Sequence, residues 1–79
     1  MRAIINVFLK DGILDPQGKA TKHALETLGF ANCGEVRIGK QIAIDIALDD
    51  KKSVMEEAEK MAKELLVNGV IENYSIEIK

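Results

Sequence analysis

The sequence has few of the residue types from which most catalytic and metal sites are built. Its 79 residues include one cysteine, one histidine and no tryptophan. A single cysteine cannot form an internal disulfide, and a single histidine cannot build a metal cluster. Neither His23 nor Cys33 stands in a recognisable nucleophile–base pattern. The sequence therefore predicts no catalytic, cofactor-binding or metal residues and favours a chain that acts by binding other proteins.

The chain also lacks a basic surplus and a long apolar run. Thirteen acidic residues against 11 basic ones give a formal net charge of −2. This balance argues against nucleic-acid binding, in which neutralisation of phosphates supplies most of the affinity. No apolar run approaches the roughly 20 residues that cross a bilayer, and the first residues do not resemble a signal peptide. We expect a cytoplasmic protein that contacts neither nucleic acid nor membrane.

The length and composition predict a single domain over residues 1–79 with an aliphatic core. Hydrophobic residues make up 47% of the chain, but aromatic residues only 4%. A chain this short buries only about 60% of the surface that its unfolded form exposes. Oligomerisation is a common way for such a chain to gain the burial that it lacks.

Hydrophobic periodicity predicts the order strand–helix–strand–strand–helix–strand. Period-two alternation indicates strands at residues 2–10, 36–38, 42–48 and 74–78. Helical spacing indicates a helix from Asp15–Pro16 to about residue 28, and a second helix, capped within residues 49–53, that ends at Asn68–Gly69. Residues 39–41 are expected to form the loop of a hairpin between the two middle strands.

This order is typical of an α+β, ferredoxin-like βαββαβ two-layer sandwich. Such a fold has a four-stranded antiparallel sheet with both helices on one face and the first and third strands in the middle. The uncovered face of the central strands would carry the apolar residues Ile4, Phe8, Ala43 and Ala47. Because an exposed apolar patch on a small protein usually marks an interface, we expect this face to pair with a second copy or a partner.

Two short stretches carry candidate partner contacts. Residues 14–18 form the entry to the first helix, and residues 36–40 lead into the expected hairpin loop. Each has a plain structural interpretation, as a helix cap or as a solvated turn, and each is also placed to contact a partner. The candidates are Asp15, Pro16, Gln17, Gly18, Arg37, Gly39 and Lys40.

Three motifs taken together resemble the PurS subunit family of phosphoribosylformylglycinamidine synthase. They are KDGILDPQG at residues 10–18, VRIGK at residues 36–40 and LLVNGVIENY at residues 65–74. The likeness covers essentially the whole chain, in order, and the first motif is the most specific. Gly69 departs from the family pattern, which has proline after the asparagine, so we expect a more flexible link to the last strand.

The resemblance implies a role in purine biosynthesis, in the conversion of formylglycinamide ribonucleotide to the amidine. It implies a non-catalytic subunit of a carbon–nitrogen ligase that takes its amido group from glutamine. Its expected partners are a second copy, a glutaminase subunit and a large ATP-dependent synthetase subunit, between which it supports ammonia transfer. ATP, magnesium and glutamine would be used by the complex, with no cofactor bound by this chain. The competing interpretation is a stand-alone ferredoxin-like dimer that senses a small ligand.

Overall fold

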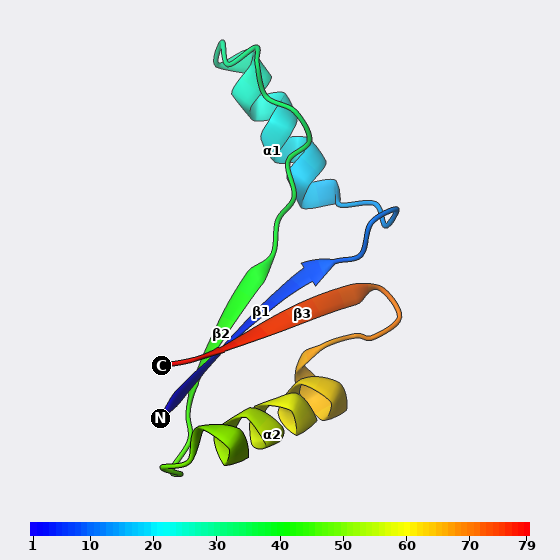
Figure 1. Cartoon of the computed structure of the whole chain (residues 1–79). Helices are drawn as coiled ribbons and strands as arrows, with labels where there is room; N and C mark the ends of the chain where they lie inside the picture. The colour runs from blue at the N-terminus through cyan, green and yellow to red at the C-terminus, as the bar shows by residue number, and fades with distance from the viewer.

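The computed structural model describes all residues, 1–79, and contains three strands and two helices. The elements in chain order are β1 (Arg2–Leu9), α1 (Pro16–Thr27), β2 (Lys40–Asp45), α2 (Lys51–Met61), a π-helical turn η1 (Ala62–Leu66) and β3 (Glu72–Ile78). Figure 1 shows α2 lying across one face of the sheet, whereas α1 extends away from the sheet. The α+β class predicted from the sequence is therefore confirmed.

The sheet has three antiparallel strands in the order β2-β1-β3. The central residue Ile5 pairs with Ile42 on one side and with Ile76 on the other. The prediction of a four-stranded, ferredoxin-like sheet is wrong, and β1 is the only central strand. Each of the two edge strands pairs with β1 only.

The core lies between the sheet and α2. Ala3, Ile5 and Val7 point to the same face of β1 because side chains alternate along a strand, and all three are buried. They face Val54 and Ala58, which are one helical turn apart on α2 and are fully buried. The predicted aliphatic core is thus present, but only one of the two helices contributes to it.

The helix ends follow local signals in the sequence. Asp15 caps α1, Pro16 occupies its first turn, and Gly29 follows its end with a positive φ of 99°. Asp50 caps α2 by accepting hydrogen bonds from the backbone N–H and the hydroxyl of Ser53, at 3.2 and 2.8 Å. Asp50 therefore takes the cap position, within the predicted residues 49–53.

The first helix does not cover the sheet, contrary to the prediction. Ala20 and Ala24, which were expected to face inward, are exposed, Leu25 is half-buried, and Leu28 is 74% exposed. The face that α1 would cover is already occupied by α2, and two alanines offer little apolar area to bury. The chain after α1 turns back and runs beside it (Figure 1). We call residues 13–39 the arm.

The predicted strand at residues 36–38, and with it the hairpin, is also wrong. The β1–β2 ladder ends where Val7 pairs with Lys40, so Lys40 and Gln41 belong to a strand rather than to a loop. The N–H of Ile38 donates to the side chain of Asp15 instead of to a neighbouring strand. Residues 36–38 therefore belong to no strand, and no strand pairs with them.

The sheet face away from α2 is more polar than its apolar pattern indicated. Ile4 pairs with Ala43 on this face, as predicted, but Ile4 is only 7% exposed. The Asn6 side chain accepts a hydrogen bond from Gln41 at 2.9 Å and donates one to Ser75 at 3.5 Å, which makes a polar row across all three strands. Arg2 and Asp45 form an ion pair beyond it, at 2.9 Å.

The outer members of the predicted apolar face remain accessible. Phe8 is 44% exposed at the far end of β1, and Ala47 is exposed beyond the end of β2. The four predicted dimer-face residues therefore do not form one continuous patch, because the polar row lies between Ile4 and Phe8. Their role in pairing stays a prediction.

Replacing Ile5 by alanine tests where the core lies. Ile5 is fully buried between the sheet and α2, so Ile5→Ala should lower the free energy of unfolding by about 2–5 kcal/mol. Glu57→Ala, on the exposed side of α2, should change it by less than about 0.5 kcal/mol. Urea denaturation followed by circular dichroism measures both. Equal effects of the two substitutions would contradict the placement of the core.

Candidate functional site

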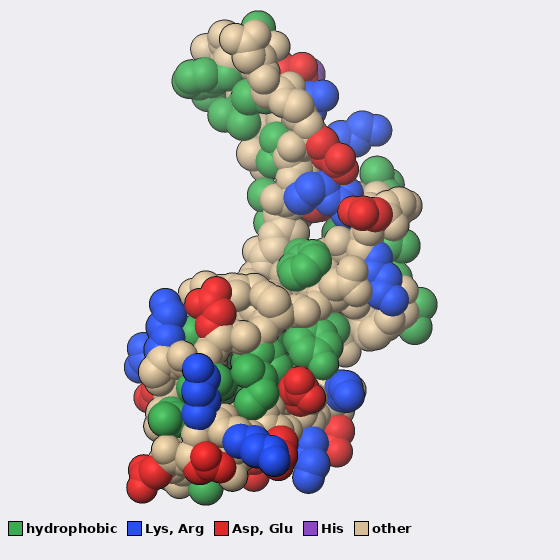
Figure 2. Space-filling model, viewed as in Figure 1, with side chains coloured by type: hydrophobic (Ala, Val, Ile, Leu, Met, Phe, Trp, Pro, Cys, Tyr) green, Lys and Arg blue, Asp and Glu red, His purple; other side chains and the backbone are tan.

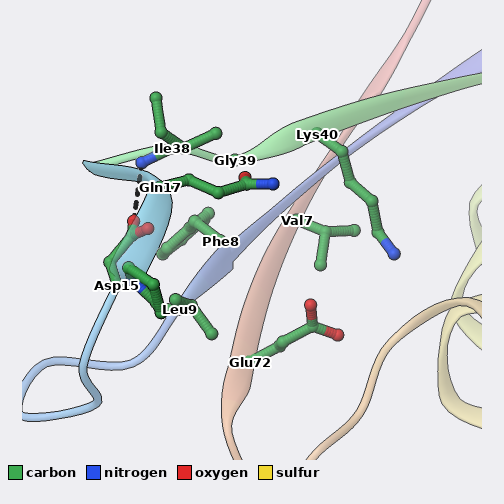
Figure 3. A pocket seen from close by; sticks show the side chains of 10 residues that line it. Val7, Phe8, Leu9, Asp15, Gln17, Ile38, Gly39, Lys40 and Glu72 are labelled. Carbon is green, nitrogen blue, oxygen red and sulfur yellow. Dashed lines mark hydrogen bonds between the residues drawn. The ribbon is translucent and has the colours of Figure 1, made fainter. Parts of the chain in front are cut away.

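The two sequence stretches that carry candidate contacts meet at the base of the arm. The first turn of α1 lies against the segment that leads into β2, next to the end of β1 (Figures 1 and 3). We call this place the junction, and it brings together all seven candidates: Asp15, Pro16, Gln17, Gly18, Arg37, Gly39 and Lys40. No local sequence pattern linked the two stretches, which are separated by the whole length of α1.

Asp15 is buried at the centre of the junction, with 6% of its surface exposed. One carboxylate oxygen accepts the N–H of Gly18 and the other accepts the N–H of Ile38, both at 2.8 Å. Figure 3 shows the bond from Ile38. These bonds hold the pKa of Asp15 below its usual value, the bond from Ile38 having the largest effect and the positive charge of Arg37 adding to it. The side chain is thus an internal support rather than an exposed contact.

Gly18 allows the two segments to approach closely. A Cβ atom at this position would overlap the carbonyl oxygen of Val36 and come within 3.1 Å of the Asp15 carboxyl carbon. Its N–H is already bonded to Asp15, so it is not free to bind a partner group. Glycine is therefore required here by contact rather than by an unusual φ.

Arg37, a candidate partner contact, folds back onto the loop after β1. Its guanidinium donates to the carbonyl oxygens of Ile13 and Lys10, at 3.1 and 3.3 Å. It also pairs with the carboxylate of Glu35, at 3.2 Å. Arg37 thus supplies three bonds at the junction, two of them to backbone oxygens that no side-chain motif reveals.

A cavity of about 400 Å³ opens between the junction and the ends of β1 and β3. Its lining includes Phe8 and Ile38 as apolar surface, with Gln17, Lys40 and Glu72 as polar groups (Figure 3). Gly39 lies at its edge, where an added Cβ would come within 2.7 Å of the carbonyl oxygen of Val7. Unlike Asp15 and Arg37, Lys40 makes no side-chain hydrogen bond or ion pair within the chain.

Some residues of the junction were not foreseen from the sequence. Glu72, at the start of β3, joins the cavity wall because β3 pairs with β1 beside the junction. Phe8 was predicted to lie on a dimer face and also lines the cavity. Neither position carries a local signal, since each depends on which strands become neighbours.

No three side chains of His, Cys, Asp or Glu come together to hold a metal ion. No helix of the structure is both long enough and apolar enough to cross a bilayer. Cys33 is half-buried in the turn beyond α1. The fold and the junction together define a small α+β protein whose most prominent features are a projecting arm and the surface at its base.

The chain belongs to the PurS family. The family profile described as "PurS: Phosphoribosylformylglycinamidine (FGAM) synthase" matches residues 2–79. The PurS subunit of Methanocaldococcus jannaschii is 40% identical over 78 residues, covering 99% of this chain and 94% of that protein. The PurS subunit of Bacillus subtilis is 39% identical over 75 residues, covering 95% and 88%. The resemblance seen in the three motifs is thereby confirmed.

Solved structures share the fold. The crystal structure of M. jannaschii PurS, described as one of the subunits of formylglycinamide ribonucleotide amidotransferase, matches with a TM-score of 0.88 at 41% identity and covers 99% of this chain and 94% of that one. A chain in the structure of PurLQS from Thermotoga maritima matches with a TM-score of 0.88 at 28% identity, covering 96% and 93%. The chain is thus a subunit of phosphoribosylformylglycinamidine synthase in purine biosynthesis.

Replacing Gly18 by alanine tests the close contact at the junction. The added methyl group meets the backbone of Val36, so Gly18→Ala should lower the free energy of unfolding by about 1–3 kcal/mol, as overpacked sites do. Gly34→Ala is the matched control, because a Cβ at Gly34 meets nothing within 4 Å. We expect the control to be neutral or slightly stabilising. A Gly18→Ala variant as stable as the control would show that the two segments do not touch.

Proposed function

We propose that this PurS-family chain forms a homodimer that bridges a glutaminase subunit and a large ATP-dependent synthetase subunit and supports the passage of ammonia between them. The observation that carries the proposal is the match to a chain of PurLQS from T. maritima, a structure named for three components. The projecting arm supports it, because an element that does not serve its own core is available to others. We place the assembly in the cytoplasm, where an unpaired thiol such as Cys33 stays reduced.

The chemistry gives such a subunit a purpose. Ammonia released from glutamine becomes ammonium in neutral water, and ammonium has no free electron pair with which to attack an activated amide. A subunit that holds two enzymes in register keeps the released ammonia close to the second site. In this arrangement ATP, magnesium and glutamine are used by the partner subunits. In this proposal the chain itself contributes contact surface.

The shape of the chain supports the homodimer. Its radius of gyration is 16.0 Å, whereas a compact domain of this length has about 12 Å. Its accessible surface of 5769 Å² exceeds the value of about 4,700 Å² that its mass predicts for a folded monomer. The excess of about 1,000 Å² is close to the roughly 800 Å² that each partner buries in a stable protein–protein interface.

Four of the nine exposed large hydrophobic residues lie on the arm. Leu14, Leu28 and Ile38 are exposed there, and Phe30 at its tip is 57% exposed. Figure 2 shows hydrophobic side chains gathered along one side of the arm and charged side chains along the other. We propose that the second copy covers this apolar side. The accessible part of the sheet face, Phe8 with Ala43 and Ala47, extends the interface.

Phe30→Ser tests this dimer. Burying a large apolar side chain contributes about 1.5–3 kcal/mol, so the substitution should weaken dimerisation by roughly tenfold or more. Leu65→Ser, at an exposed apolar residue beyond α2, is the control and should leave dimerisation unchanged. Sedimentation equilibrium measures both dissociation constants. A wild-type chain that stays monomeric at high concentration would contradict the homodimer. Equal weakening of dimerisation by both variants would contradict the placement of its interface on the arm.

Lys40→Ala tests the partner contact. Lys40 lines the junction cavity and has no intramolecular partner to lose, so the variant should fold and dimerise normally but capture less of the two partner subunits. Arg37→Ala is a less clean probe, because Arg37 also bonds the loop after β1. Lys60→Ala, exposed on α2, is the control. Co-purification and glutamine-dependent synthase activity are the two readouts. Unchanged capture and unchanged activity with Lys40→Ala would contradict a contact at the junction.

A thermal-shift screen of the isolated chain distinguishes this proposal from ligand sensing. Sensing requires that a nucleotide or amino acid stabilise the chain in the absence of partners, because any ligand that binds only the folded state raises its stability. The bridging proposal expects no such stabilisation and expects co-purification with both enzymes. A metabolite that raises the melting temperature of the chain alone would favour the sensing dimer.

A further inference from the structure

The arm is joined to the sheet only through the junction. Helix α1 does not lie on the sheet, and its neighbour is the returning segment of the same arm (Figure 1). Two connections join the arm to the sheet, one after β1 and one before β2. A body attached in this way can pivot unless something fixes the two connections to each other.

The Asp15 carboxylate is placed to fix them. It lies at the start of α1, yet the second of its two 2.8 Å bonds comes from Ile38, 23 residues further along the chain. The same carboxylate therefore caps the helix and ties the helix to the segment that enters β2. Gly18 brings the two segments into contact, and Arg37 ties the second segment to the loop after β1.

We propose that Asp15 is the positioning residue of the arm: its carboxylate joins the first turn of α1 to residues 36–38, and this bond fixes the direction in which the arm leaves the sheet. Asp15 touches no partner itself in this account, because it is buried within the chain. The inference rests on the proposed function only in taking the arm and junction as contact surfaces. The bond itself is a property of the chain alone.

The chemistry of the carboxylate matters, because it must accept two N–H groups at once. An asparagine in its place has one acceptor oxygen and one NH₂ group. In any orientation the NH₂ group would face the N–H of either Gly18 or Ile38, so one bond would be replaced by two opposed donors. A serine could still cap the helix, since a hydroxyl accepts from the first turn, but its short side chain has no second oxygen for Ile38.

A matched comparison is available within the chain. Asp50 also caps a helix and also accepts an N–H three residues later, that of Ser53. Its bonds all remain within the first turn of α2, and it ties no second segment. Asp50→Asn therefore removes a helix cap without removing a tie. A difference between the two variants isolates the tie to Ile38.

The test is a distance measurement across the junction. In a chain with Cys33 replaced by serine, spin labels at Asn32→Cys and Lys79→Cys report the distance from the arm tip to the end of β3. Dilution with unlabelled chain removes distances between copies. We expect Asp15→Asn and Asp15→Ser to broaden the distance distribution, and Asp50→Asn to leave it as narrow as in the parent chain.

Hydrogen exchange provides the second readout in the same proteins. Asp15→Asn should speed exchange of the Ile38 amide by roughly tenfold or more, the effect of losing a hydrogen bond to a charged group, while amides of β1 and β3 keep their protection. In Asp15→Ser the helix amides of α1 should stay protected while that of Ile38 does not. An unchanged distance distribution together with an unchanged Ile38 amide would overturn the proposal. Broadening by Asp50→Asn to the same extent would also overturn it.

Acid provides an independent check with a defined sign. The pKa of Asp15 is lowered in the folded chain, so its stabilising effect is present above the usual aspartate value of about 3.9 and is lost as the pH falls through the lower folded value. Lys19, Lys22, Glu35 and Arg37 line one side of the Asp15 site, and Lys40 and Glu72 line the other. Of these, only Glu35 and Glu72 are carboxylates.

The distance distribution of the parent chain should therefore broaden as the pH falls below the usual aspartate value of about 3.9. Glu35→Gln and Glu72→Gln should broaden in the same way. In Asp15→Asn the distribution should already be broad at pH 7 and change little. If the acid-induced broadening is lost in Glu35→Gln or Glu72→Gln, the acid response comes from that glutamate and not from Asp15. This result would contradict the proposal.

Synthase assays with both partner subunits separate this inference from the proposed function. If Asp15→Asn broadens the distance and lowers glutamine-dependent activity, while Asp50→Asn does neither, both stand. If the distance broadens but capture of the partners and activity are unchanged, Asp15 still positions the arm, and the proposed contact role of the arm fails. If activity falls while the distance is unchanged, the positioning role fails.

Discussion

The structure depends on one buried carboxylate that joins parts of the chain far apart in sequence. Asp15 accepts one hydrogen bond from the first turn of α1 and one from the segment that enters β2. Helix α1 does not pack onto the sheet, as a first helix in such a fold usually does (Figure 1). The core under α2 supplies stability, and α1 with its returning segment is left free as an arm. The exposed apolar side of that arm and the open junction follow from this division.

Much of the fold could be predicted from local pattern. The alternation in β1 and β3, and the cap and glycine stop of α1, gave these elements within a few residues of their observed bounds. The wrong element was the strand at residues 36–38, whose alternation is real but whose neighbour is a helix start. Local pattern reports whether a segment is extended. It does not report whether another strand lies beside it, because a ladder depends on tertiary placement.

In the candidate site, too, local sequence pattern did not reveal the tertiary contacts. The pattern Asp15–Pro16–Gln17–Gly18 revealed a helix cap, which is a local property. That the same aspartate holds Ile38, or that Arg37 holds the carbonyl oxygens of Ile13 and Lys10, could not be inferred, because backbone acceptors leave no trace in residue identity. The family likeness nevertheless singled out both stretches, and the structure places them together. Residues 14–18 and residues 36–40 are distant in sequence but lie together at the junction.

In the proposed assembly, residues 13–40 form the surface through which this PurS-family chain meets its partners, while α2 and the core under it serve stability. The decisive measurement is hydrogen exchange of the chain, alone and with the proposed glutaminase and synthetase partners. Partner binding should slow amide exchange within residues 13–40 and leave the outward face of α2 unchanged. Protection confined to α2, with the arm and junction exchanging as in the free chain, would contradict this assembly.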